Sequence, residues 1–274
     1  MKHFLIAALL IIPAAAFGAD KLPPAVQVIP DPDLKRPALT YDYCLDLART
    51  KPEQAIEFAG RWVALGGDEP AKHCQAVALI GLKSFGEAAT RLETLANDSK
   101  SAGDVRAGML AQAAQAWMLE GEPNRAYKAQ TSALELATAG SRIQADLYVD
   151  RAMTLAEGEK YNEAIEDLDA ALKIAPKNSD ALAFRASAHR RLNELDAALA
   201  DADSAVAADQ KNANAFLERG AIYQLKGRTA DARQDWIAAI ELDPTSDAAA
   251  AARAAIENHD VKPEVGVPAE PKKK

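Results

Sequence analysis

Two cysteines and a neighbouring histidine are the residues of this chain best suited to chemistry. Cys44 and Cys74 are its only cysteines, and His73 precedes the second. Zinc sites combine such ligands at short, regular spacing, but His189 and His259 are remote in the sequence and no such spacing occurs. The absence of a Cys-x-x-Cys pair also disfavours a redox site. A disulfide remains the first interpretation, with free thiols or a metal site as the alternatives.

No motif of a known catalytic chemistry is visible. The chain lacks a Gly-x-Ser-x-Gly elbow, a phosphate-binding glycine-rich loop and a His-Glu-x-x-His pair. Carboxylates are plentiful, so the cluster Glu163, Glu166, Asp167 and Asp169 is interpreted as a solvated outer face. We therefore predict no catalytic residue, no cofactor and no metal.

The first nineteen residues have the order of a secretory signal peptide. Lys2 is followed by an apolar run over residues 4–12, by Pro13 and by small residues. Cleavage sites compatible with this pattern follow Ala16, Gly18 and Ala19. The alternative is an uncleaved amino-terminal helix. The run is shorter than the roughly 20 residues that span a bilayer, so we expect a periplasmic or secreted protein with no membrane insertion after signal removal.

The predicted compartment and the charge limit the partners further. In an oxidising compartment a lone pair of cysteines forms a disulfide by default. The net charge of -8 and the pI near 5.2 disfavour nucleic acid, because binding to phosphates needs lysine and arginine. The lysines at 272–274 are interpreted as a solvated end. A protein or peptide is the remaining partner class.

An internal repeat organises the second half of the chain. The stretches 147–176, 183–210 and 216–244 align at a shift of 34 residues. Three sets of small residues fall in register: Ala152, Ala186 and Gly220; Ala164, Ala198 and Ala232; Ala171, Ala205 and Ala239. Each unit carries two apolar stripes at helical spacing, and Gly158, Asn193 and Gly227 mark or adjoin the break between them. The period indicates helix hairpins whose small residues allow close crossing.

This pattern resembles the tetratricopeptide repeat. The third unit carries the matching residues Phe216, Gly220, Tyr223, Gly227, Ala232, Trp236, Ala239 and Pro244. The resemblance implies an all-α fold, a right-handed superhelical α-solenoid of helix-turn-helix repeats with a C-terminal capping helix.

Weaker copies of the unit extend the array upstream. Ala114 and Ala76 lie 38 and 76 residues before Ala152, and a degenerate pair surrounds Pro52. We divide the chain into a signal peptide (1–19), a proline-rich linker (20–39), degenerate helix pairs (40–144), three well-matched repeats (145–246), a capping helix (247–259) and a disordered tail (260–274).

Two charged ladders share the 34-residue period. One contains Arg151, Arg185 and Arg219, and the other contains Asp167, Asp201 and Asp235. Because the second helix of one unit packs on the first helix of the next, we predict the pairs Asp167–Arg185 and Asp201–Arg219. The alternative is a row of arginines that binds an anion. Cys44 and Cys74 are likewise predicted on the first helices of neighbouring pairs, where a disulfide would staple the degenerate end of the array.

The resemblance also implies a concave groove, lined mainly by first helices, that holds a peptide or a partner helix. The groove candidates are Met118, Val149, Met153, Phe184, Ser187, Arg190, Arg191, Leu217, Ala221 and Gln224. The lysine and asparagine clamp that binds chaperone carboxyl termini is missing, which disfavours that ligand class. A terminal segment covering the groove stays open as an alternative.

Three functions are compatible with these observations. The first is an exported adaptor that holds a protein or peptide in the groove. The second is an accessory component of envelope assembly or transport that binds through its outer faces. The third is a small-molecule binder or an enzyme without recognisable motifs.

Overall fold

The computed structural model describes residues 31–260, and the predicted signal peptide, most of the linker and the tail after residue 260 lie outside this range. The described residues form thirteen helices and no strand. Six hairpins pair α1 (Pro37–Thr50) with α2 (Pro52–Ala64), α3 (Asp68–Gly81) with α4 (Phe85–Asp98), α5 (Gly103–Glu120) with α6 (Pro123–Leu136), α7 (Arg142–Glu157) with α8 (Tyr161–Ile174), α9 (Ser179–Arg191) with α10 (Leu195–Ala208), and α11 (Ala213–Leu225) with α12 (Thr229–Leu242). The last helix is α13 (Asp247–Asp260).

Helix ends follow local sequence signals. Pro37 opens α1 because proline suits the first helical turn, and the helical array begins there instead of at residue 40. Asn178 and Asn212 cap α9 and α11 by accepting hydrogen bonds from backbone N–H groups, each over 3.1 Å. The Ser246 hydroxyl caps α13 in the same way.

Each hairpin from α3–α4 onward turns at one residue with positive φ. These residues are Lys83, Gly121, Glu159, Asn193 and Gly227. In the first well-matched unit the left-handed residue is Glu159, next to Gly158. Successive residues of this set are 38, 38, 34 and 34 positions apart, which equals the offsets between the repeats. The same left-handed turn therefore closes each of these hairpins.

Small buried residues allow the two helices of each unit to approach closely. Ala152, Ala186 and Gly220 are all buried. The size of each small residue depends on the side chain that faces it from the second helix. Ala152 shares a core cluster with Leu168, whereas Gly220 faces the larger Trp236. A Cβ at Gly220 would lie 2.6 Å from the Trp236 ring. Position 220 is therefore glycine, where the other two units have alanine, because the facing side chain in this unit is the large Trp236.

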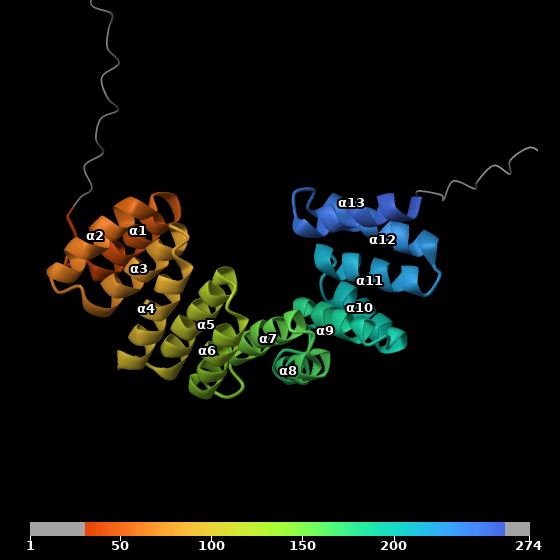
Figure 1. The fold of residues 1–274 in the computed structure, drawn as a ribbon, viewed down its shortest axis with the longest axis horizontal. Coiled ribbons are helices and arrows are strands. Elements are labelled where there is room, and N and C mark those ends of the chain that lie inside the picture. Colours follow the sequence, from red (N-terminus) through yellow and green to blue (C-terminus); the bar gives the residue numbers. More distant parts are fainter. Residues whose placement is uncertain (1–30, 261–274) are drawn as a thin grey trace, which may run out of the picture.

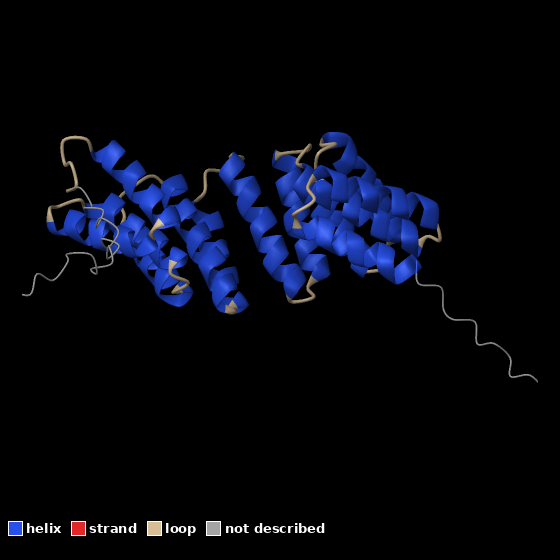
Figure 2. Ribbon diagram, turned by 90° about the horizontal axis from the view of Figure 1, so that it is seen from above, coloured by secondary structure: helices blue, strands red, loops and turns tan. Residues whose placement is uncertain are grey.

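The hairpins stack into an open arc (Figure 1). First helices contact the first helices of neighbouring units, as in α7 with α9 and α9 with α11. Closer spacing among first helices places them on the inner side of the arc. Seen from above, the array is a single elongated row (Figure 2). The α13 helix packs on α11 and α12 at one end.

The charged ladders form ion pairs, but the predicted partners are wrong. Arg151, Arg185 and Arg219 each hold the aspartate sixteen residues later in their own unit, through paired hydrogen bonds of 2.7–2.9 Å. The predicted pairs Asp167–Arg185 and Asp201–Arg219 do not form. In an antiparallel hairpin, residues equally distant from the turn face each other, and Glu159 lies midway between Arg151 and Asp167.

The links between units come from a different aspartate. The Arg185 guanidinium also binds Asp169 of the preceding unit at 2.6 Å, and Arg219 binds Asp203 at 3.2 Å. Asp169 and Arg185 are equally distant from the loop between α8 and α9. Asp167 is buried, so it does not belong to the solvated outer face expected for its cluster. Hydrogen bonds to Asp201 raise the pKa of Arg185 above its ordinary value, although burial opposes this shift.

A disulfide joins the first two hairpins. Cys44 on α1 and Cys74 on α3 are bonded, with their Cα atoms 6.1 Å apart. Both residues are fully buried, beside Phe58 and Trp62. The bond ties the outermost hairpin to the stack at the end where the repeat pattern is weakest.

Candidate functional site

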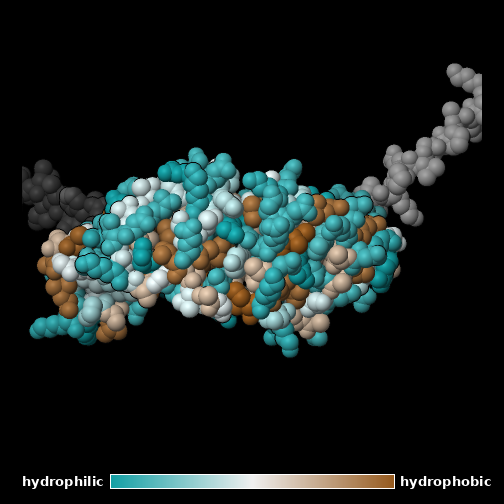
Figure 3. Space-filling view, turned by 90° about the horizontal axis from the view of Figure 1, so that it is seen from below, coloured by the Kyte–Doolittle hydropathy of each residue, from teal (hydrophilic) through white to brown (hydrophobic). Residues whose placement is uncertain are grey.

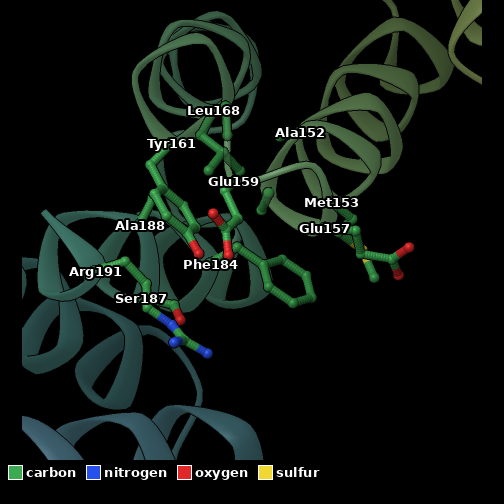
Figure 4. A pocket seen from close by; sticks show the side chains of 12 residues that line it. Ala152, Met153, Glu157, Glu159, Tyr161, Leu168, Phe184, Ser187, Ala188 and Arg191 are labelled. Atoms are coloured by element: carbon green, nitrogen blue, oxygen red, sulfur yellow. The ribbon is translucent and has the colours of Figure 1, made fainter. Parts of the chain in front are cut away.

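A pocket of about 430 Å³ opens between α7, α8 and α9. Its apolar lining is formed by Ala152, Ala156, Ala164, Leu168 and Ala188, with Met153 and Phe184 beside them. Figure 4 shows Phe184 between the side chains of Glu159 and Tyr161 and those of Met153 and Glu157. Met153 is 42% exposed, so much of its apolar side chain is accessible to a ligand. The volume of the pocket lies within the range of ligand sites.

The structure brings together four of the predicted groove residues in this pocket. They are Met153, Phe184, Ser187 and Arg191. All four belong to first helices of two adjacent units, α7 and α9. Met153 and Ser187 are equivalent positions of the 34-residue repeat, and the stacking of the units makes all four residues neighbours.

Other predicted groove residues are occupied or buried. Val149 is only 8% exposed and belongs to the core of the α7–α9 region, so its assignment to the groove is wrong. Arg190 is paired with Glu218 on α11. Gln224 contacts the His259 ring nitrogen at 3.2 Å, so α13 covers this end of the inner side.

The remaining three candidates are half-buried. Met118 lies 3.6 Å from the Thr154 hydroxyl, measured at its sulfur. Leu217 packs against the core around Trp236, and Ala221 lies on the same helix, α11. None of the three lines the pocket. The open part of the predicted groove is therefore confined to the α7–α9 region.

Charged groups without a partner surround the pocket. Within residues 31–260, the side chains of Glu157, Glu159 and Arg191 make no ion pair or hydrogen bond, although Arg190 beside them is paired. These groups remain available to a ligand.

Asp150 is a further functional candidate that the sequence analysis missed. It lies on α7 one turn before Met153, and its carboxylate has no hydrogen bond or ion pair in the described chain. Burial, together with the negative charge of Asp146, raises the pKa of Asp150 to about 6. The available signal was the spacing of Asp146, Asp150, Met153 and Glu157, which places them along one helical face.

Replacement of Asp150 by asparagine should stabilise the protein at neutral pH. The pKa of Asp150 is about 6 in the folded chain and near 3.8 in the unfolded chain. Between pH 3.8 and pH 6 the carboxyl is therefore protonated in the folded state and ionised in the unfolded state. The stabilising proton is lost as the pH rises through 6. After a discount for solvent screening, we expect Asp150→Asn to raise the free energy of unfolding by about 1–2 kcal/mol above pH 7.

Urea unfolding at about pH 7.5 and pH 4 measures this effect. The gain should vanish at the lower pH, where the native carboxyl is already protonated. A gain of equal size at both pH values would contradict the assigned pKa. Glu163→Gln, at an exposed position of α8, is the matched control.

A second, more polar pocket of about 340 Å³ lies near the disulfide. The His73 ring joins the Tyr41 hydroxyl on α1 and the Gln112 side chain on α5, each at 2.8 Å. Burial lowers the pKa of His73, which favours a neutral ring between a donor and an acceptor. Both ring nitrogens are satisfied, so we assign this trio a structural role.

Among the described residues, no three His, Cys, Asp or Glu side chains gather in a way that would hold a metal ion. None of the described helices is long and apolar enough to cross a membrane.

Comparison with known proteins agrees with the architecture. The tetratricopeptide repeat model matches residues 145–178. Three similar crystal or solved structures illustrate the fold: BtubC (BKLC) from P. vanneervenii, with 16% identity over 89% of this chain and 100% of that chain and a TM-score of 0.56; MamA from Desulfovibrio magneticus RS-1, with 19% identity over 65% and 97% and a TM-score of 0.54; and YrrB, with 19% identity over 69% and 92% and a TM-score of 0.50. No curated protein matches the chain.

These identities are low, so the similar structures establish the fold alone. YrrB is described as a TPR protein with an unusual peptide-binding site. The matched repeat lies in the first of the three units whose 34-residue register is visible in the sequence. Together, the matched repeat, the stacked hairpins and the similar structures show that this chain contains a tetratricopeptide repeat at residues 145–178 within an all-α solenoid fold.

Proposed function

We propose that this protein is an exported adaptor that holds a partner protein on its inner side, and that it is not an enzyme. The observation that carries the proposal is the pocket between α7 and α9. It combines an exposed methionine and a half-buried phenylalanine with charged groups that have no partner in the described chain. Methionine suits adaptable contacts with another protein. The peptide-binding site described for YrrB, which shares the fold, is compatible with this use.

The outer side offers less to a partner. Figure 3 shows the array from below, with hydrophobic residues in separate groups among hydrophilic ones. Several exposed positions of α8 are charged, including Glu163 and Glu166. Binding through the outer faces, as an assembly or transport component, is therefore the second candidate.

Photo-crosslinking from intact cells tests the site. A photoreactive residue at Phe184 should capture a discrete partner, which mass spectrometry identifies, whereas the same residue at Glu166 should not. Glu166 is the matched control because it is exposed on the opposite helix of the neighbouring hairpin. Adducts only from Glu166 would move the function to the outer faces. No adduct from either position would reject the adaptor proposal.

Export is proposed from the signal-like residues 1–19, which lie outside the described range, and it is compatible with the buried disulfide. We expect the mature chain to begin after Ala16, Gly18 or Ala19. The intact mass of the protein recovered from the periplasm or the medium measures this start. A full-length chain recovered only from the cytoplasm would rule out export.

A further inference from the structure

We propose that the pocket between α7 and α9 selects a segment of its partner that carries a bulky apolar side chain flanked by lysine or arginine. This inference rests on the proposed function and adds the chemistry of the partner. It follows from the apolar lining, from the carboxylates beside it and from the distribution of paired and unpaired charges on the inner side.

The apolar part of the pocket fits one large side chain. Ala152, Ala156 and Ala188 leave the volume open because their side chains are short. Met153 and Phe184 are large enough to cover an inserted group from two sides (Figure 4). Transfer of an apolar side chain from water into this volume would be favourable, in proportion to the area buried.

The charged part of the site is acidic on the α7 side. Glu157 and Glu159 line the pocket, and Asp146 and Asp150 lie outside its lining, on the same face of α7 as Met153 and Glu157. Asp150, Glu157 and Glu159 have no counterion among the described residues, and Asp146 has only the exposed Arg142 at 3.7 Å.

Asp150 is the most informative of these carboxylates. It is partly buried, and a carboxylate loses hydration there without gaining a partner in the described chain. A cation supplied by the partner would restore the missing interaction. The same residue costs stability in the free protein, as expected for a group whose partner arrives only on binding.

The positive charges near the pocket do not cancel this preference. Arg190 is neutralised by Glu218, and Arg185 is neutralised by Asp201 and Asp169. Arg191 alone lines the pocket as an unpaired cation, and it lies on the far side of Phe184 from Glu157 in Figure 4. Glu157 and Arg191 thus lie on opposite sides of Phe184, with Glu159 on the side of Arg191, so the segment would place its lysine or arginine over α7, beside Glu157 and Asp150.

Two labelled peptides test this preference by fluorescence anisotropy with the full chain. Both carry one central phenylalanine in a glycine–serine background, flanked by lysines in the first peptide and by glutamates in the second. At low salt, we expect the lysine peptide to bind at least tenfold more tightly. The preference should shrink as salt is added, because exposed charges are screened.

Matched charge variants separate the site from general attraction to an acidic protein. The variant Asp150→Asn/Glu157→Gln should weaken binding of the lysine peptide at least fivefold. The control Glu163→Gln/Glu166→Gln removes the same charge from exposed positions of α8 and should change binding less than twofold. Met153→Gln, at an exposed position, should weaken the phenylalanine peptide but not a version with alanine at its centre.

Equal losses in the two double variants would overturn the proposal, as would equal or absent binding of both peptides. The chain's own lysines are another candidate occupant. If Lys272→Gln/Lys273→Gln/Lys274→Gln tightens binding of the lysine peptide tenfold or more, the pocket belongs to the chain's own carboxyl-terminal segment and the partner assignment fails. The crosslink from Phe184 judges the adaptor function separately, because it captures a partner of any charge.

Discussion

Arg185→Met is expected to lower the free energy of unfolding by about 3 kcal/mol. The guanidinium binds both carboxylate oxygens of Asp201, at 2.8 and 2.7 Å, and reaches Asp169 of the preceding unit at 2.6 Å. The Asp201 side chain is 13% exposed, so the variant leaves a nearly buried carboxylate without its counterion. Urea unfolding followed by circular dichroism at neutral pH measures the loss.

Three variants show which contact carries the effect. Asp201→Asn should cost more than Asp169→Asn, because the Asp169 side chain is 48% exposed and water screens its charge. Arg185→Met/Asp201→Leu removes both charges of the buried pair and should lose less than Arg185→Met alone. Arg142→Met is the control, since that arginine is 93% exposed and should change stability by less than about 0.5 kcal/mol. Equal losses at Asp169 and Asp201 would contradict the pairing within one unit.

Removal of the disulfide should have an effect of similar size. Cys44 and Cys74 are 30 residues apart, and closing such a loop restricts the unfolded chain by about 3–4 kcal/mol in the chain-entropy model. We expect Cys44→Ala/Cys74→Ala to lower the free energy of unfolding by that amount. Chemical reduction of the native protein should reproduce most of the loss, which separates the crosslink from the change in packing.

The loss of stability without the disulfide should be confined to one end of the array. The α1 and α2 helices contact α3 and form the end of the stack, so the variant should release them first. Hydrogen exchange should quicken over residues 37–64 and stay unchanged over α7 to α12. Uniform acceleration along the array would show that the units unfold together and would contradict a local role for the bond.

The repeat pattern in the sequence predicted some of the contacts in the fold correctly and others wrongly. The register of Ala152, Ala186 and Gly220 predicted the helix hairpins and their tight crossings, because close packing admits only small side chains there. The same period placed Met153 and Ser187 at equivalent positions of adjacent units, and the fold brings them, with Phe184, to one pocket. The pairing of Arg185 was predicted with the wrong aspartate, although the symmetry of residues 185 and 201 about Asn193 was visible. Because the two helices of a hairpin run antiparallel, Arg185 and Asp201 face each other within one unit.

The sequence by itself determined the repeat, the helical class and the residues available for an inner surface, since these depend on local spacing and side-chain size. Only the tertiary structure decided which of those residues are open. Val149 is buried by the packing of its neighbours, Gln224 contacts α13, and Arg190 is paired with Glu218. It also revealed Asp150 as a partly buried carboxylate without a counterion in the described chain. Burial and pairing depend on residues distant in the chain, and a local period carries no information about them.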